Sequence, residues 1–445
     1  MQKAAIVILT AAMLTCLFPW AAASAKKLSK SRPPSAELTL GTRVLVGYQG
    51  WFRCPNDGAP SHSWIHWMSG PAGTQHLTVD LLPDTRELPT GGLCAVPPGV
   101  AGEHPAPVFS SYSPGVVLKH FEWMRTYGID GALVQRFINE APRLRSENDV
   151  VVANIRAAAE ANGRTFAMEY DLSGVDQHTM LDKVRTDWTY LVQTRQLTSS
   201  PSYLKFKGRP VVSIWGLGFK GGGHPDDPDR VLELIHWLKD SAHVAVMGGV
   251  PAHWRALAGD STSDPRWRAV YAELDVIQPW TVGRYGTCTG VNDWNTTHIQ
   301  PDLAQAKANG QLYMPVIFPG FSWRNLKVGS QKNQIPRLGG KFLWRQAYNA
   351  RHSGAQVVKI AMFDEVDEGT AIFKAAPSLS DPTGSDFWLT LDADGYRLPS
   401  DWYLQVARKI SVGFHGGAMA PSLDLSHVPV APGRDADRRI QEGAC

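Results

Sequence analysis

Short runs of apolar and β-branched residues recur along the chain at fairly regular intervals. They lie at 43–52, 129–137, 164–174, 209–219, 244–254, 276–285, 313–323 and 356–365. Most of them are apolar at consecutive positions and do not alternate with polar residues. Such runs predict strands buried on both faces, as in a parallel sheet covered by helices.

Helical periodicity fills most of the intervals between these runs. The helical segments are 116–128, 149–163, 181–197, 229–240, 266–275, 302–310 and 342–354, and a last one at 400–410 follows the eighth strand. Several end in Gly or Asn-Gly, a common helix stop. Eight alternating units of this kind predict an α/β fold, and at this length they favour a closed (β/α)8 TIM barrel that forms a single catalytic domain.

An open, nucleotide-binding sheet is the alternative for such an alternating pattern. The glycine-rich stretch "GLGFKGGG" at 216–223 follows the fourth strand and is succeeded by "HPDDPD". A dinucleotide-binding Gly-x-Gly-x-x-Gly turn instead follows the first strand of its sheet. We therefore interpret the stretch as a loop and predict no cofactor.

The two ends of the chain differ from the middle. Residues 1–25 carry Lys3, an apolar stretch and the small-residue end Ala23-Ser24-Ala25. This pattern predicts a signal peptide and export to the periplasm or the exterior, with an uncleaved anchor as the alternative. Residues 26–40 and 413–445 lack periodicity and predict a disordered lead-in and tail around a barrel domain at 41–412. No later stretch is apolar enough for stable membrane insertion.

Composition narrows the class of partner. A formal charge of +3, from 44 basic and 41 acidic side chains, is too balanced to suggest nucleic acid. Sixteen Trp need a large core or a cleft where flat apolar ligand faces stack. The sequence leaves the oligomeric state open.

Four cysteines would remain after cleavage. In an oxidising compartment Cys54 and Cys94 could form a disulfide. By closing a loop, this bridge would contribute about 4 kcal/mol to the stability of the protein in the chain-entropy model. None of the cysteines lies in a CxxC or Cys/His cluster, so we predict no zinc or other metal site from them.

Polar and aromatic side chains gather at the ends of the predicted strands, where a barrel of this type has its active site. They are Tyr48, Trp51, Gln135, Arg136, Glu169, Asp171, Trp215, His253, Trp254, Trp280, Arg284, Tyr285, Trp323 and Asp364. Indole rings stack on the apolar faces of sugars, and carboxylate, Arg and amide groups bind sugar hydroxyls. We therefore interpret these residues as substrate-binding, with a carbohydrate as the substrate.

Four acids crowd the end of the eighth strand, in "AMFDEVDEGTAIF" at 361–373. Glycoside cleavage uses two carboxyl groups, one protonated and one ionised, and neighbouring acids push their pKa values apart. Asp364 and Asp367 have a simpler interpretation as caps or as partners of Arg side chains. Two alternatives stay open: a metal-dependent hydrolase that uses the acid oxygens as ligands, and a non-catalytic carbohydrate-binding barrel.

The segment "FDEVDEGTAIF" resembles the Phe-Asn-Glu-x-x-Glu-Gly-Thr motif of glycoside hydrolase family 99, the endo-α-1,2-mannosidases and mannanases. Together with "GYQGWFRCPNDG", "WGLGF", "MGGVPAHWR", "PWTVGRY" and "FPGFSW", it is similar to bacterial family 71/99-like proteins, some of which carry the label xylosidase/arabinosidase. This looser resemblance covers about 43–409.

The resemblance implies roles for two of the four acids. Glu365 would be the general base that deprotonates the sugar's own 2-hydroxyl, giving a 1,2-anhydro intermediate and net retention. Glu368 would protonate the leaving oxygen and later activate water. The sequence departs from the motif at Asp364 and at Val366-Asp367. The extra carboxyl of Asp367 is expected to alter which glutamate holds the proton.

Overall fold

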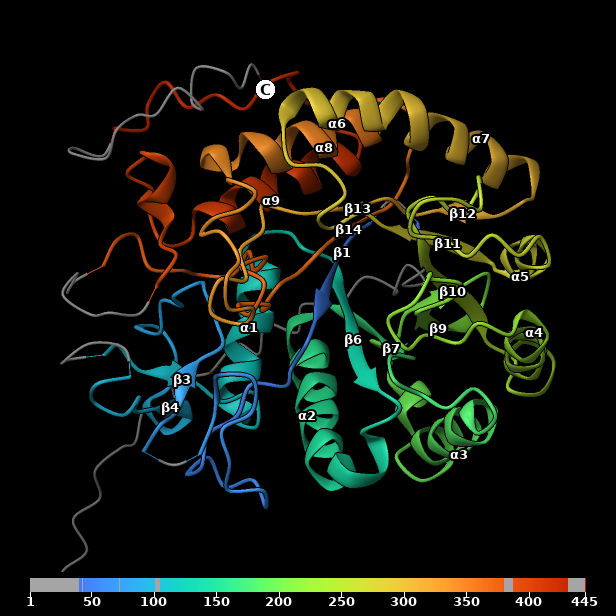
Figure 1. The fold of residues 1–445 in the computed structure, drawn as a ribbon, viewed down its shortest axis with the longest axis horizontal. Coiled ribbons are helices and arrows are strands. Elements are labelled where there is room, and N and C mark those ends of the chain that lie inside the picture. The colour runs from blue at the N-terminus through green and yellow to red at the C-terminus, as the bar shows by residue number, and fades with distance from the viewer. Residues whose placement is uncertain (1–39, 42, 72, 101–104, 380–386, 431–444) are drawn as a thin grey trace, which may run out of the picture. The chain divides into compact units, whose positions relative to one another are not determined.

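The computed structural model describes residues 40–41, 43–71, 73–100, 105–379, 387–430 and 445. The predicted signal peptide and the lead-in up to residue 39 lie outside these residues. Within them, a parallel sheet forms the centre of the fold and helices lie around it (Figure 1).

Every one of the eight predicted strands is present in the sheet. In ring order they are β1 (Val44–Tyr48), β6 (Gly131–Phe137), β7 (Thr165–Asp171), β9 (Arg209–Trp215), β10 (Ala245–Pro251), β11 (Val276–Trp280), the short pair β12 (Leu312–Tyr313) and β13 (Val316–Ile317), and β14 (Val358–Ile360). β12 pairs with β11, β13 pairs with β14, and β14 pairs with β1. Since β12 and β13 are consecutive parts of the seventh run, the ring closes through Met314 and Pro315, and the predicted TIM barrel is confirmed.

The register of the sheet brings strand ends together. Phe137 at the end of β6 lies opposite Asp171 at the end of β7, and Asp171 lies opposite Trp215 at the end of β9. Further round, Pro251 of β10 lies opposite Trp280 of β11. Side chains that are distant in the sequence therefore meet at the C-terminal edge of the sheet.

The predicted helices are present around the barrel. They are α1 (Pro114–Thr126), α2 (Ala141–Asn162), α3 (Met180–Gln193), α4 (Pro228–His236), α5 (Trp267–Glu273), α7 (Gln300–Ala308), α8 (Lys341–His352) and α9 (Trp402–Phe414). The sequence pattern did not indicate α6 (Cys288–Trp294), because Thr, Gly, Asn and Asp in this stretch are weak helix formers. None of the helices among the described residues is both long and apolar enough to span a membrane.

A long segment between β1 and α1 carries two small two-stranded sheets. These pair β2 (Met68–Ser69) with β3 (His76–Leu77) and β4 (Leu93–Cys94) with β5 (Val108–Phe109). A further short strand, β8 (Lys205–Phe206), pairs with β9. A disulfide joins Cys54 to Cys94 within the long segment, as the sequence allowed.

The C-terminal part of the chain continues to pack beyond residue 412, where the sequence pattern placed the end of the barrel domain. α9 runs to Phe414, which is fully buried, and Leu423 is also buried. A second disulfide, which was not predicted from the sequence, joins Cys445 to Cys288 at the start of α6.

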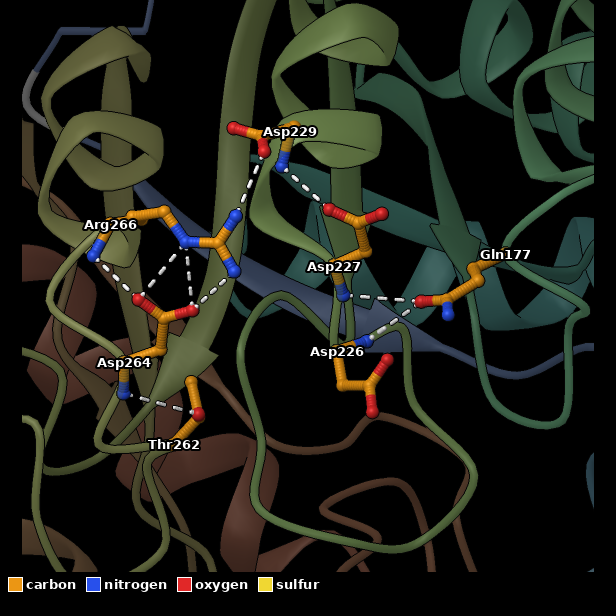
Figure 2. A network of polar contacts seen from close by, with 7 residues as sticks. All are labelled: Gln177, Asp226, Asp227, Asp229, Thr262, Asp264 and Arg266. Atoms are coloured by element: carbon orange, nitrogen blue, oxygen red, sulfur yellow. Dashed lines mark hydrogen bonds and ion pairs between the residues drawn. The ribbon is translucent and has the colours of Figure 1, made fainter.

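The glycine-rich stretch at 216–223 and the "HPDDPD" that follows form the connection between β9 and α4. The acids of this connection have local partners (Figure 2): Asp227 caps α4 by accepting a hydrogen bond from the backbone N–H of Asp229, 3.1 Å away. Gln177 accepts hydrogen bonds from the backbone N–H groups of Asp226 and Asp227, and Arg266 pairs with Asp229. Capping and ion pairing therefore account for the carboxyl groups of Asp227 and Asp229.

Candidate active site

A cavity of about 310 Å³ lies at the C-terminal end of the barrel. Its lining comes from β6, β7, β9, β11 and β14 and from the segments that follow β1, β7, β13 and β14. The lining residues are Gln49, Trp51, His66, Gln135, Phe137, Glu169, Asp171, Ser173, Trp215, Trp280, Leu326, Lys359, Met362, Glu365, Asp367 and Glu368. The cavity therefore brings together half of the residues that were predicted to be catalytic or substrate-binding, including both motif glutamates.

Glu365 is the more buried of the two motif glutamates, with 3% of its surface exposed. Its Oε2 accepts a hydrogen bond from Nε2 of Gln49, and its Oε1 accepts one from the backbone N–H of Asp367 at 3.0 Å. Glu368 is partly exposed, and within the described part of the chain its carboxyl group has no hydrogen-bond partner. The two carboxyl groups thus face one cavity in different environments.

Residues 364–371 form the acid segment, and its carboxyl groups tend to keep their protons. Burial raises the pKa of Glu365 well above its ordinary value, and the charges of Asp367, Glu368 and Asp364 raise it further. Burial likewise raises the pKa of Glu368 to about 7 and that of Asp367 well above its ordinary value. Because each ionisation opposes the next, these groups titrate as a coupled set that retains protons near neutral pH.

Asp364 lies at the start of the acid segment but does not line the cavity. It is fully buried, and its two carboxyl oxygens accept hydrogen bonds from the backbone N–H groups of Gln49 and Gly50 at 2.8 and 2.9 Å. Gly50 has φ +61°, a conformation that most other residues rarely adopt. Asp364 therefore fixes the turn after β1 and places Gln49 beside Glu365.

The backbone of the acid segment is held from two further sides. The guanidinium of Arg337, which is buried, donates to the carbonyl oxygens of Gly369 and Ala371 at 2.6 and 2.8 Å. The backbone N–H of Ser322 donates to the carbonyl of Glu368 at 2.8 Å. The two glutamates are thus mounted on a segment whose backbone has little freedom to move.

Charged side chains also line the cavity. Glu169, predicted to bind substrate, lines the cavity, but its carboxylate pairs with Lys359 and accepts a hydrogen bond from Oγ of Ser213 at 2.9 Å. Asp171 is held by Nε2 of Gln135 and the backbone N–H of Ser173, both at 2.7 Å. Burial raises the pKa of Asp171 to about 6.

Aromatic rings form the walls. Trp51 stacks on His66, with ring centroids 3.7 Å apart, and on Phe137 at 5.4 Å. Trp215 and Trp280 meet edge to face at 5.7 Å. Four buried polar atoms of lining residues have no hydrogen-bond partner among the described residues: Nε1 of Trp51, Nε1 of Trp215, Oε1 of Gln49 and Oδ1 of Asp367. This mixture of apolar faces with donors and acceptors suits a ligand that is rich in hydroxyl groups.

Some predicted residues lie outside the cavity because successive side chains of a strand point to opposite faces. Gln135 and Phe137 line the cavity, whereas Arg136 between them is buried and pairs with Asp187 and Asp149. By the same alternation Tyr48 points away from the cavity, and its hydroxyl lies 3.0 Å from Nδ1 of His120.

The remaining predicted residues lie beyond the strand ends, and each contacts a partner elsewhere. Trp254 donates to Asp302, and Tyr285 donates to Gln346. His253 and Arg284 both pair with Asp260, and the ring of Trp323 lies under the ammonium of Lys327.

Several lining residues were not predicted. Gln49 and Phe137 follow from the strand alternation, and Lys359 is a single charge inside the apolar run "QVVKIAMF", so the sequence did hold a signal for them. His66 lies in the long segment after β1, where no periodicity marks it. Among the described residues, no three or more His, Cys, Asp or Glu side chains are grouped in a way that could hold a metal ion.

No protein-family model matches the chain, and no curated protein matches it in sequence. Its barrel is nevertheless found in solved structures. Two structures of the GH99 endo-alpha-mannosidase from Bacteroides thetaiotaomicron superpose with TM-scores of 0.60 and 0.59 at 16% identity, covering 84% of this chain and 98% of that chain. A "Glycoside hydrolase-like protein" superposes with a TM-score of 0.49 at 14% identity, covering 80% of this chain and 99% of that chain. The resemblance to family 99 thus extends from the acid segment to the fold.

Proposed function

We propose that the protein is an exported glycoside hydrolase that cleaves a glycosidic bond in a poly- or oligosaccharide, with Glu365 and Glu368 as its catalytic residues. The observation that carries the proposal is that both glutamates line one cavity between tryptophan walls at the C-terminal end of the barrel. Export is supported by the signal-peptide pattern and by two disulfides, which form in oxidising compartments.

The two glutamates are suited to different roles. Glu368, whose pKa is raised to about 7 by burial, carries a proton that it can donate to the leaving oxygen. Glu365 accepts hydrogen bonds from Gln49 and from the backbone of Asp367, and both contacts favour its ionised form. Burial and the charges of Asp367, Glu368 and Asp364 raise the pKa of Glu365. When Asp367 and Glu368 keep their protons, two of these three charges are absent and ionisation of Glu365 costs less. Its raised pKa also makes Glu365 a stronger base.

The resemblance to family 99 supports a retaining reaction in two steps. Glu365 takes the proton of the sugar's 2-hydroxyl, O2 bonds to C1, and the bond from C1 to the leaving oxygen breaks as Glu368 protonates that oxygen. Glu368 then takes a proton from water, the hydroxide bonds to C1 as the bond between C1 and O2 breaks, and Glu365 returns its proton to O2. Each proton that leaves a glutamate returns to it by the end of the cycle.

The charges of the cavity indicate the kind of sugar. Lys359 is the one Lys or Arg among its described lining residues, and its ammonium is already paired with Glu169, so the lining offers no unpaired Lys or Arg side chain to an anionic group. Such a cavity disfavours anionic glycans and suits neutral ones. Since the solved structures of similar fold are endo-alpha-mannosidases, α-mannans are the first candidates.

The test is product analysis after incubation with α-mannans, α-glucans and arabinoxylans. We expect one of these to be shortened by the wild type, and Glu365→Gln and Glu368→Gln each to lower the rate by a factor of 10³ or more, on the order of 4 kcal/mol, while the circular dichroism spectrum stays that of the wild type. Glu233→Gln, at an exposed position of α4, is the matched control and should keep full activity.

Full activity of both glutamate variants would contradict the assignment. Glycan binding without any product would favour a non-catalytic carbohydrate-binding barrel. Activity that is lost in a chelator and restored by one divalent ion would favour a metal-dependent hydrolase.

A further inference from the structure

His66 contacts the acid segment although 301 positions separate it from Asp367 in the sequence. Its Nδ1 lies 2.9 Å from Oδ2 of Asp367, and its ring stacks on Trp51 with an angle of 3° between the ring planes. The carbonyl of His66 accepts a hydrogen bond from Oγ1 of Thr78 at 2.7 Å. These three contacts fix the position of the imidazole at the edge of the cavity.

The backbone of His66 is in an uncommon conformation. Its φ is +61°, in the left-handed region that residues other than glycine rarely adopt. Such conformations cost about 1–3 kcal/mol and persist where the surroundings hold them, often at functional sites. With this backbone conformation, the ring of His66 lies over Trp51 and against Asp367.

The second ring nitrogen is available to a ligand. Nε2 has no hydrogen-bond partner among the residues that the structure describes, and 31% of the His66 side chain remains exposed where it lines the cavity. Asp367 is more enclosed: its side chain is 5% exposed, and its Oδ1 is buried without a partner in the described part of the chain. A ligand in the cavity therefore meets the imidazole at Nε2.

We propose that His66 binds the substrate by donating a hydrogen bond from Nε2–H to a sugar oxygen, and that protonated Asp367 donates to Nδ1 and so fixes this tautomer. The hydrogen bond made by one ring nitrogen of a neutral histidine decides which proton the other nitrogen carries. The sugar contact rests on the proposed function, whereas the tautomer does not.

The proposed hydrogen bond requires a neutral His66 ring and a protonated Asp367, and burial favours both states. It lowers the pKa of His66 to about 4, so the ring is neutral near pH 7 and carries one proton. Glu140 raises and Arg53 lowers the pKa of His66, but both effects are smaller than that of burial.

Burial also raises the pKa of Asp367 well above its ordinary value. The other groups that act on this pKa are Glu368, Asp364 and Asp80, all acidic, and each of them raises it. Asp367 therefore retains its proton, and because Nδ1 of a neutral ring can accept, the O–H of Asp367 has a hydrogen-bond acceptor at 2.9 Å.

A neutral donor at this place would distinguish sugar oxygens from one another. The proposed base Glu365, once ionised, only accepts hydrogen bonds, so it binds hydroxyls and cannot bind a ring or glycosidic oxygen, which lacks a proton. An N–H donor can bind such an oxygen. His66 would thus help to select the orientation in which the sugar enters.

The tautomer can be measured without any substrate, by ¹⁵N NMR of histidine-labelled full-length protein between pH 5 and 8, with the His66 signals assigned by their loss in His66→Asn. We expect protonated Nε2 and unprotonated Nδ1 in the wild type. Asp367→Asn should leave this pattern unchanged, because its amide N–H also donates to Nδ1. Asp367→Ala should give a mixture of the two tautomers. Protonated Nδ1 in the wild type, or a change of tautomer in Asp367→Asn, would overturn the assignment.

The sugar contact is tested on the glycan that the wild type cleaves. His66→Asn should lower kcat/KM at least tenfold, mainly through KM, and Asp367→Asn should lose less than Asp367→Ala. His62→Asn is the control, because His62 lies in the same segment, is exposed and also has a positive φ, which asparagine tolerates. Wild-type kinetics in His66→Asn would overturn the contact. If no glycan in the panel is cleaved or bound, the proposed function fails, and the spectra still decide the tautomer.

Discussion

Lys359 and Glu169 form an ion pair inside the barrel, with Nζ of Lys359 2.7 Å from Oε2 of Glu169 and each side chain 1% exposed. Lys359 also donates to Oε1 of Gln278 at 3.0 Å. Removing one partner of a buried pair leaves an uncompensated charge. We therefore expect Lys359→Met to lower the free energy of unfolding by about 3–5 kcal/mol, measured by urea denaturation.

A double variant separates the effect of charge from that of packing. Lys359→Met combined with Glu169→Gln should recover most of the loss, because no buried charge is then unpaired. Lys119→Met is the control: its pair with Glu122 lies on the surface of α1, and such pairs contribute about 1 kcal/mol or less. An equal loss in the single and the double variant would show that packing, and not charge, explains the result.

The pH dependence of activity should follow the proton on Glu368. Burial raises the pKa of this group to about 7, so the proposed acid is protonated below that pH and loses its proton as the pH rises through it. We expect kcat/KM to fall on the alkaline side with a midpoint near pH 7, measured on the cleaved glycan. A rate that stays constant from pH 6 to 9 would contradict the role of Glu368 as the proton donor.

Stability should depend on the same group. A carboxyl group whose pKa is raised on folding stabilises the protein fully below its unfolded value of about 4.5, and this contribution is lost as the pH rises through about 7. Glu368→Gln does not titrate. The wild type should therefore lose stability relative to Glu368→Gln between pH 4.5 and 7, measured by thermal unfolding of both proteins in the same buffers.

The aromatic walls give a prediction about substrate binding. Trp280 lines the cavity, whereas Trp254 is buried elsewhere and donates to Asp302. Loss of one stacking ring weakens the binding free energy of the substrate by on the order of 1.4 kcal/mol, so Trp280→Leu should raise KM about tenfold. Trp254→Leu should lower stability and leave KM unchanged. Equal changes of KM in both variants would show that stability, and not contact with the sugar, controls the effect.

The sequence pattern was sufficient for the barrel because each strand had to be buried on both faces, and that requirement is visible in the order of apolar residues. It was also sufficient for the acid segment, where two glutamates and a Gly-Thr stand in a recognisable register. Two features were not visible in the pattern: the seventh strand pairs through two short pieces, and α6 is a helix. Both depend on packing that single-sequence propensities do not record.

The wall residues were harder to predict, for two physical reasons. Strand alternation directs Arg136 and Tyr48 away from the cavity, whereas their neighbours Phe137 and Gln49 line it, so an error of one residue in the assumed register is enough to choose the wrong neighbour. Gln135, predicted together with Arg136, does line the cavity. His66 comes from a long irregular segment, and only the tertiary structure places it beside Asp367. A loop of this kind carries no periodic signal from which its position could be inferred.

The disulfide between Cys54 and Cys94 closes a loop that contains His66, with 40 positions between its ends. In the chain-entropy model, a bridge of this span restricts the unfolded chain and stabilises the protein by about 4 kcal/mol. Cys54→Ser combined with Cys94→Ser should therefore lower the free energy of unfolding by about that amount, measured by guanidinium denaturation without reductant. With reductant, the free energy of unfolding of the wild type should fall below that of this double variant. The reason is that reductant also opens the bridge between Cys288 and Cys445, which closes a longer loop of 157 positions. If reductant instead leaves the wild type unchanged while the double variant is destabilised, the loss comes from the substitutions at two buried positions and not from the crosslink.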